Sequence, residues 1–170
     1  MNDAAAIRVF EGHRLAVYRW ALRVLGRHHD ALDVTQDVGL RWLVQCRRSA
    51  PDQPRSWLRR VTLNRATDFL RRRASGPGVE RAELNHVAAP GLDDPLVRQE
   101  FRLRVARALR DLSDMQRQVL VAKLWDGLTF AQVARELGIS TPTAKTHYVR
   151  ALGSVRTKLG DWLQPSRGEP

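Results

Sequence analysis

Apolar and polar positions alternate with a helical period through most of the chain, most clearly between positions 127 and 160. Apolar side chains there recur mainly at intervals of three or four residues in two runs separated by Gly138, a spacing typical of helices with one buried face. The first run comprises Phe130, Val133, Ala134 and Leu137, and the second comprises Ala144, Tyr148, Ala151, Val155 and Leu159. Because a glycine in the left-handed conformation commonly ends a helix, the pattern predicts two helices joined at Gly138.

Capping residues and a polar face extend this prediction. Thr129 and Gln132 form a T-x-x-Q capping box before the first helix, Ser140 or Thr141 caps the second, and Pro142 suits its first position. The polar positions of the second helix are Thr143, Lys145, Thr146, His147 and Arg150. The segment therefore reads as a helix–turn–helix whose basic face can enter a DNA major groove, although a helix pair with a merely solvated basic face has the same pattern.

Helical periodicity also divides the chain into domains. It predicts long helices at 4–26, 30–47 and 55–73, and further helices from 99 to 126, with a second capping box at Ser113 and Gln116. Positions 74–95 are rich in proline, glycine and acidic residues and lack this period, which favours a linker. We therefore predict an all-α protein of two small helical domains, with a first domain at 1–73, a flexible linker at 74–98, a second domain with the helix–turn–helix at 99–163, and a disordered tail at 164–170.

The charge of the chain points to a polyanionic partner. Of the 170 residues, 29 are Lys or Arg and 18 are Asp or Glu, which gives a net charge of +11. The two predicted domains carry the excess, and the linker is slightly acidic. Nucleic acid is the commonest partner for such a balance. A membrane surface is the competing polyanion, but the apolar faces are interrupted by small and polar residues, and no segment has the roughly 20 apolar residues of a spanning helix. The N-terminus has no secretion signal pattern, so we expect a cytoplasmic protein.

Cofactor and catalytic chemistry is not indicated. The single cysteine, Cys46, excludes an intramolecular disulfide and is expected to be a buried thiol. His28 and His29 are adjacent in a polar turn, without the further ligands of a zinc site. We find no nucleophile–base pair and no phosphate-cradling glycine loop, so we expect no metal, no cofactor and no enzymatic activity.

The predicted helix at 55–73 combines seven arginines with Trp57 beside a proline-containing loop. Cations that hold phosphates and an aromatic ring that stacks on a base are the usual means of binding single-stranded nucleic acid. A tryptophan in a small helical domain is also a common core residue, and the pattern alone leaves both roles of Trp57 open.

Taken in order, three segments resemble the extracytoplasmic-function sigma factors, the small two-domain promoter-recognition subunits of bacterial RNA polymerase. Positions 30–42, DALDVTQDVGLRW, are similar to the polymerase-binding helix of that family. Asp33, Gln36 and Asp37 stand at its characteristic polar positions, whereas Leu32 and Gly39 replace the usual acid and aromatic residue. Positions 55–73 resemble the promoter-melting helix, and positions 138–151 resemble the recognition helix, with Pro142 in place of glycine and His147 in place of arginine.

The resemblance implies a role for each segment. The polymerase-binding residues would be Asp33, Gln36, Asp37 and Arg41, which meet the clamp of the largest subunit of core RNA polymerase. The residues at the minus-ten element of promoter DNA would be Trp57, Arg60, Asn64, Arg65, Arg71 and Arg72, with Arg59 and Arg73 as further phosphate contacts and the loop at 48–54 helping to capture unpaired bases. The residues at the minus-thirty-five element would be Thr143, Lys145, Thr146, His147 and Arg150. An anti-sigma factor is a further possible partner.

Two other classes of function share part of this pattern. A helix–turn–helix regulator that acts without polymerase needs neither the acidic helix at 30–47 nor the arginine-rich helix at 55–73. An RNA-binding or antitermination-like protein would prefer structured RNA to promoter DNA. We therefore predict a sigma factor, with the helix–turn–helix regulator as the main alternative.

Overall fold

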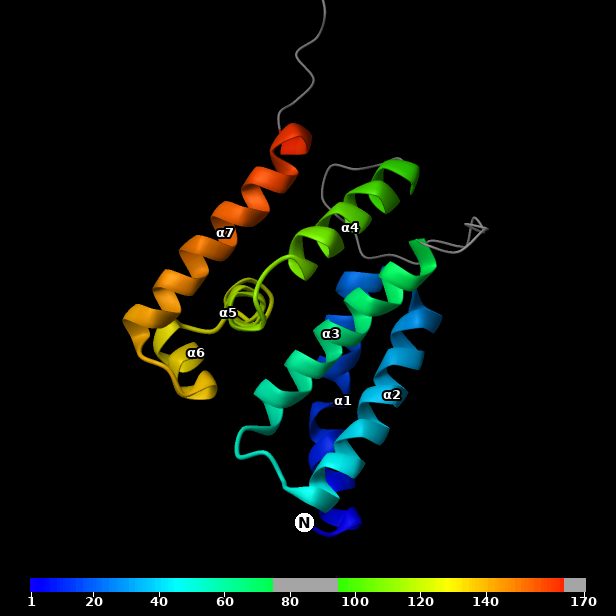
Figure 1. The fold of residues 1–170 in the computed structure, drawn as a ribbon. Coiled ribbons are helices and arrows are strands. Elements are labelled where there is room, and N and C mark those ends of the chain that lie inside the picture. The colour runs from blue at the N-terminus through cyan, green and yellow to red at the C-terminus, as the bar shows by residue number, and fades with distance from the viewer. Residues whose placement is uncertain (75–94, 164–170) are drawn as a thin grey trace, which may run out of the picture. The chain divides into compact units, whose positions relative to one another are not determined.

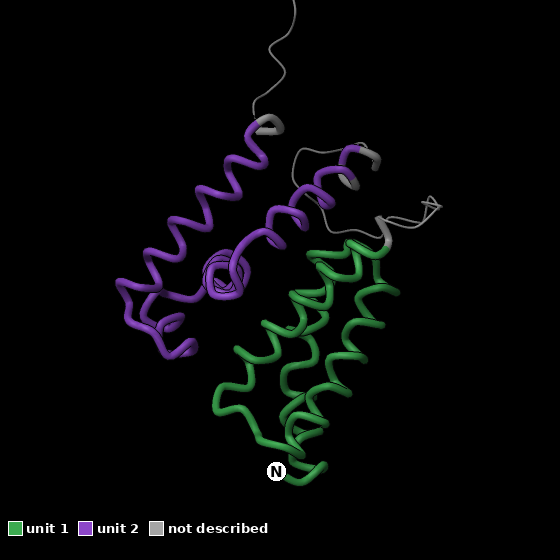
Figure 2. The backbone as a smooth tube through the Cα atoms, viewed as in Figure 1, with its two compact units in different colours: residues 1–95 green, residues 96–170 purple. Residues whose placement is uncertain are grey.

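The computed structural model describes residues 1–74 and 95–163, and within these ranges the chain forms seven helices and no strand (Figure 1). The chain divides into two compact units, residues 1–95 and 96–170 (Figure 2). The predicted all-α fold is confirmed. Part of the predicted linker, residues 75–94, and the predicted tail, 164–170, lie outside the described residues.

The first unit contains three long helices that pack on one another. They are α1 (Asp3–Leu25), α2 (His28–Arg48) and α3 (Pro54–Ala74). Gly26 ends α1 with a φ of 73°, and its N–H donates to the carbonyl of Leu22. Trp20 and Trp42 are the largest fully buried side chains, and the indole N–H of Trp42 donates to the carbonyl of Ala6 at 2.9 Å. This bond satisfies a polar group that would be costly to bury alone, and it fixes the start of α1 against α2.

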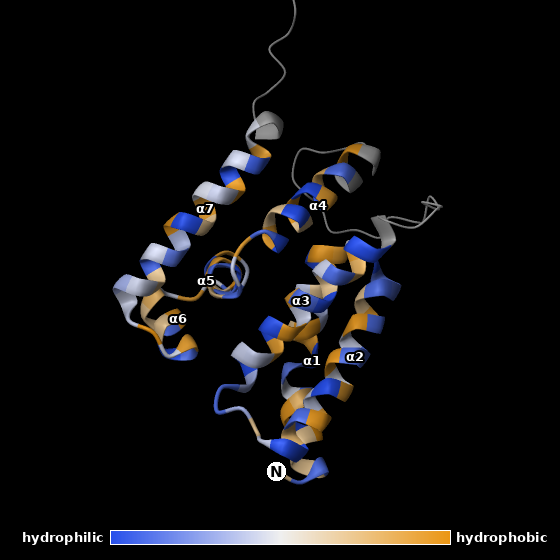
Figure 3. Ribbon diagram, viewed as in Figure 1, coloured by the Kyte–Doolittle hydropathy of each residue, from blue (hydrophilic) through white to orange (hydrophobic). Residues whose placement is uncertain are grey.

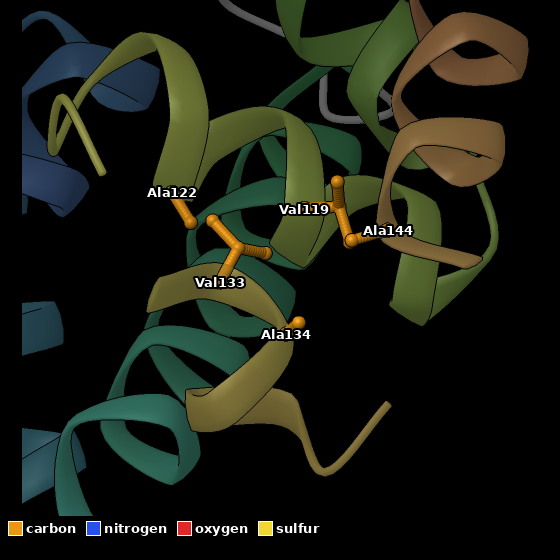
Figure 4. Close-up of a cluster of buried hydrophobic side chains, with 5 residues drawn as sticks. All are labelled: Val119, Ala122, Val133, Ala134 and Ala144. Atoms are coloured by element: carbon orange, nitrogen blue, oxygen red, sulfur yellow. The ribbon is translucent and has the colours of Figure 1, made fainter. Parts of the chain in front are cut away.

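The second unit contains α4 (Pro95–Arg110), α5 (Asp114–Leu124), α6 (Phe130–Leu137) and α7 (Thr141–Leu163). Helix α5 packs against both α6 and α7, and these pack on each other. Five small or β-branched residues form the cluster where they meet, namely Val119, Ala122, Val133, Ala134 and Ala144. In Figure 4, Val133 lies beside Ala122, and Val119 lies beside Ala144. Small side chains at this cluster allow α6 and α7 to cross closely.

The predicted caps of the second unit are present. Ser113 with Gln116 and Thr129 with Gln132 both form reciprocal capping boxes. Gly138 has a φ of 65° and ends α6. Two boundaries differ from prediction: α4 starts at Pro95, inside the predicted linker, and α7 starts at Thr141, which places Pro142 second rather than first. Ser140 caps α7, because its hydroxyl oxygen accepts from the N–H of Thr143 at 3.1 Å. Proline is tolerated at either position, since the first-turn N–H groups have no intrahelical acceptor.

Hydrophilic and hydrophobic residues alternate along each helix instead of forming long apolar segments (Figure 3). Within residues 1–74 and 95–163, no helix combines the length and the apolar character needed to cross a membrane.

Candidate polymerase-binding and DNA-binding sites

Asp37 is the centre of an ion-pair cluster between α2 and α3. Its Oδ2 accepts from Arg41 Nε at 3.0 Å, one turn along α2, and from Arg65 Nε at 2.5 Å, across on α3. The Asp37 side chain is 34% exposed. A hollow between the two helices is lined by Asp33, Val34, Asp37, Arg65, Phe69 and Arg72. Residues predicted for polymerase binding and residues predicted for DNA binding therefore share one surface.

Gln36, the remaining predicted polymerase-binding residue, lies at a second hollow, between α1 and α2. Gly39 and Leu40 line the same hollow with Ile7 and Phe10. A Cβ atom at position 39 would lie 3.0 Å from two ring carbons of Phe10. Phe10 therefore fills the space beside Gly39, and α1 supplies an aromatic ring where the family usually carries one on α2. Leu40 stands next to it with 65% exposure.

Trp57 is packed on the core and is also partly accessible. Its ring packs edge-on against the buried ring of Trp42, with centroids 5.5 Å apart and planes at 61°. The side chain is only half-buried, and it lines a hollow together with Arg41, Arg48 and Val61. Trp57 is thus anchored to the core by one side and accessible at another.

Arg59 does not lie where the sequence analysis expected it. It is fully buried, and its guanidinium lies 5.9 Å from the ring centroid of Trp20. The guanidinium of Arg55 lies 5.8 Å from the same centroid. A buried guanidinium over an indole cannot hold a phosphate without leaving the core, so the phosphate role expected for Arg59 is wrong. The signal was available, because Arg59 falls in register with the buried Thr62 and Ala66, three and seven residues on.

The other predicted minus-ten residues lie at or near the surface. Arg60, Arg71 and Arg72 are exposed, whereas Asn64 and Arg65 are half-buried. The side chain of Arg73 lies outside the described residues. The exposed guanidinium groups can reach a phosphate backbone, while Asn64 is held closer to the helix bundle.

Helix α7 presents the predicted recognition face. Ala144 and Ala151 are fully buried on one side, and Thr143, Lys145, Thr146 and Arg150 are exposed. His147 is half-buried at the border between the two sides. Lys145 and Arg150 have neither an ion pair nor a side-chain hydrogen bond to any residue that the structure describes. Their charges are therefore available to an external anion.

The two threonine hydroxyls of this face make hydrogen bonds within the first turns of α7 and to its N-cap. Thr143 Oγ1 lies 2.7 Å from the Oγ of Ser140, and Thr146 Oγ1 donates to the carbonyl of Pro142 at 3.1 Å. Such bonds fix the side-chain rotamers, so the methyl group and the remaining lone pairs are presented in a defined orientation.

One shifted pKa lies beside the predicted polymerase-binding residues, because burial raises the pKa of Asp30 and the carboxylate of Asp33 adds to the rise. The pKa of Asp111 is lowered by its hydrogen bond and charge interaction with Lys158, and also by Arg110. Cys46 is buried as predicted, and burial raises the pKa of its thiol. Among residues 1–74 and 95–163, no group of three potential metal ligands occurs.

Comparison with known families agrees with this division. Residues 9–76 match the model of sigma-70 region 2, and residues 102–155 match that of sigma-70 region 4. The two units thus define a sigma-70-type transcription initiation factor. Along its length the chain is similar to SigK of Mycolicibacterium vanbaalenii, an ECF RNA polymerase sigma factor, with 34% identity over 169 residues that cover 94% of this chain and 84% of SigK. SigK of Mycobacterium tuberculosis is 30% identical over 167 residues, covering 93% and 88% of the two chains.

The chain belongs to the ECF RNA polymerase sigma factors. It directs core RNA polymerase to specific promoters, and the helix–turn–helix regulator without polymerase binding is not favoured. A solved structure of CnrH in complex with the cytosolic domain of CnrY shares the fold, with a TM-score of 0.53, 24% identity, and coverage of 96% of this chain and 92% of CnrH.

Proposed function

We propose that core polymerase is bound by the docking face of α2, formed by Asp33, Gln36, Asp37 and Arg41. All four side chains are exposed or half-exposed, and the strongly exposed Leu40 lies among them. Two carboxylates around an apolar residue suit a basic surface of the polymerase clamp with an apolar contact at its centre.

The minus-ten element is bound by the exposed side of α3. Arg60, Arg71 and Arg72 hold backbone phosphates, which position the strand without reading its sequence. Trp57 offers a partly accessible ring in the first turn of this helix, and the amide of Asn64 can both donate to and accept from the edge of an unpaired base. The half-buried setting of Asn64 supports base reading, because a fixed amide discriminates better than a mobile one.

The minus-thirty-five element is read by α7. The observation that carries this proposal is the pair of exposed cations Lys145 and Arg150, neither of which pairs with a residue in 1–74 or 95–163, on the side of α7 opposite its buried alanines. They lie about 140° apart around the helix, so they reach different parts of one groove. Either can donate to O6 and N7 of guanine, and Thr143 and Thr146 can contact a base edge or a phosphate.

The test is holoenzyme binding to single-base variants of the upstream element, with the wild-type chain and with Lys145→Ala and Arg150→Ala. Loss of a base contact should cost about 1–3 kcal/mol at the matched sequence and relax preference at one base pair. Loss of a phosphate contact should weaken all sequences equally and lower the salt slope. Base reading by this pair would be refuted if both variants lost affinity uniformly across the set.

The remaining properties follow from this role. The protein acts in the cytoplasm, where its polymerase and promoter partners are, and it contributes binding energy without catalysing a reaction or carrying a cofactor.

The boundaries proposed for its parts are 1–73 for the region-two domain, 74–98 for the linker and 99–163 for the region-four domain. An anti-sigma factor is a further proposed partner, and the exposed Leu40 and Val44 of α2 are apolar side chains that such a partner would cover.

A further inference from the structure

His147 has two ring nitrogens in different environments. Its Nδ1 is buried and has no hydrogen-bond partner among the residues that the structure describes, whereas the side chain as a whole is half-exposed. At about 100° per residue, His147 lies about 60° around α7 from the fully buried Ala144. The ring therefore has its Nδ1 edge against the body of the unit and its Nε2 edge toward the recognition face.

The buried nitrogen decides where the ring carries its proton. A neutral imidazole has one N–H and one lone pair. An N–H buried without an acceptor costs about 1–3 kcal/mol, and orphaned buried N–H groups are rarer than unsatisfied acceptors. The neutral ring of His147 therefore carries its hydrogen on Nε2, where it is accessible, and buries the bare Nδ1.

We propose that His147 is a specificity-determining residue that donates its Nε2–H to N7 of a purine in the minus-thirty-five element. This inference rests on the proposed reading of that element by α7. His147 is the seventh residue of α7, and in helix–turn–helix proteins the N-terminal part of the second helix contacts base edges. Its ring is short and packed at the border of the core, so it suits the groove floor better than the distant phosphates reached by long arginine side chains.

N7 is the appropriate acceptor for a single neutral donor. Both purines present N7 in the major groove, whereas cytosine presents an amino donor there and thymine presents O4 and, at the place of N7, its methyl group. His147 would thus add a purine requirement at one position, beside the bidentate contacts open to Lys145 and Arg150. The position usually held by an arginine in this family would contribute shape and hydrogen bonding instead of charge.

Two amide side chains provide matched variants. The amide nitrogen of glutamine can occupy the place of Nε2, whereas that of asparagine reaches only the place of Nδ1. His147→Gln therefore keeps the proposed donor, and His147→Asn removes it with a similar loss of ring packing. His147→Arg restores a cation and should steepen the dependence of log K on log salt by about 0.9 if it reaches a phosphate.

The experiment uses the full chain assembled with core polymerase at pH 8, on promoter duplexes selected by this holoenzyme from a randomised upstream element. Each purine of the selected element is replaced in turn by its 7-deaza analogue. At one position the analogue should weaken wild-type binding about 2- to 10-fold, as expected for the loss of one hydrogen bond. The same analogue should weaken the Gln variant similarly and leave the Asn variant unchanged, and the salt slopes of wild type and Gln should agree.

Two results would overturn the proposal. One is that no 7-deaza position affects wild-type binding, or that the sensitive positions affect the Asn variant equally. The other is that His147→Gln lowers the salt slope relative to wild type, which would make the ring a phosphate-bound cation. Failure of the proposed function looks different, because Lys145→Ala and Arg150→Ala would then either leave upstream-element binding unchanged or weaken it uniformly across the single-base variants. The position assigned to His147 must also stay sensitive to the base analogue in Lys145→Ala and Arg150→Ala, so the test holds even if a substitution at position 147 destabilises the fold.

Discussion

Asp37→Arg separates the stability of the first unit from its binding to polymerase. In the free protein, Asp37 pairs with Arg41 on its own helix and with Arg65 on α3. The substitution removes both pairs and places a third cation between two arginines. If the docking face meets a basic surface of polymerase, the same substitution also replaces an attraction there by a repulsion.

The two effects differ in size. The Asp37 side chain is 34% exposed and that of Arg41 is 49% exposed, so each pair contributes only about 0.2–1 kcal/mol to folding. The unit should therefore stay folded, with a loss of about 1–2 kcal/mol. At an interface, like charges in contact cost several kcal/mol, and each 1.4 kcal/mol is a tenfold change in affinity. We expect at least a 100-fold weaker complex with core polymerase, and a smaller loss for Asp37→Asn.

The assay is a titration of core polymerase with labelled chain, with hydrogen exchange as a check that residues 1–74 remain folded. Arg65→Gln is the matched control, because it breaks the pair to α3 and leaves the docking carboxylate in place. Unchanged holoenzyme formation by Asp37→Arg would refute the docking assignment. If Arg65→Gln weakened assembly as much as Asp37→Asn, Asp37 would act by fixing the helix pair and not by contacting polymerase.

Three further predictions follow from particular contacts. The buried Arg117 donates from Nε and Nη2 to the carbonyls of residues 109, 110 and 112, at and just after the end of α4. Arg117→Met should therefore lower the free energy of unfolding of the second unit by about 3 kcal/mol. Hydrogen exchange should show lost protection in 95–163 but not in 1–74. Gly39→Phe should destabilise the first unit by about 1–3 kcal/mol, because Phe10 occupies the space beside Gly39. In a double-mutant cycle, Phe10→Ala in the same chain should reduce the cost of Gly39→Phe. Additive losses of stability from the two substitutions would contradict this competition for space. The pKa of Asp111 is lowered in the folded state by Lys158, so its contribution to stability is complete above the unfolded pKa and disappears as the pH falls through the folded one. The melting temperatures of wild type and Asp111→Asn should therefore differ at pH 7 and converge only when the pH is well below 3.8, the ordinary pKa of the group. A difference that stayed equal down to the lowest pH at which the protein folds would refute the pairing.

Local sequence signals determined much of this protein. Both capping boxes and the left-handed Gly138 formed as the sequence predicted, because a cap depends on residues within one helical turn of each other. The helical periods and the polar, basic face of α7 are likewise properties of single segments. The motif order along the chain was enough to indicate the sigma factor family.

Only the tertiary structure decided which side chains meet across helices. The pairing of Asp37 with Arg65, and the place of Phe10 beside Gly39, join residues 28 and 29 positions apart, so no periodicity within one helix reveals them. Arg59 was assigned to the surface because it is charged, yet the rings and helices around it bury it over Trp20. The same holds for His147, whose two nitrogens differ only because the folded unit covers one of them. Sequence patterns fix the face on which a side chain stands, whereas burial and pairing depend on what the other helices bring to that face.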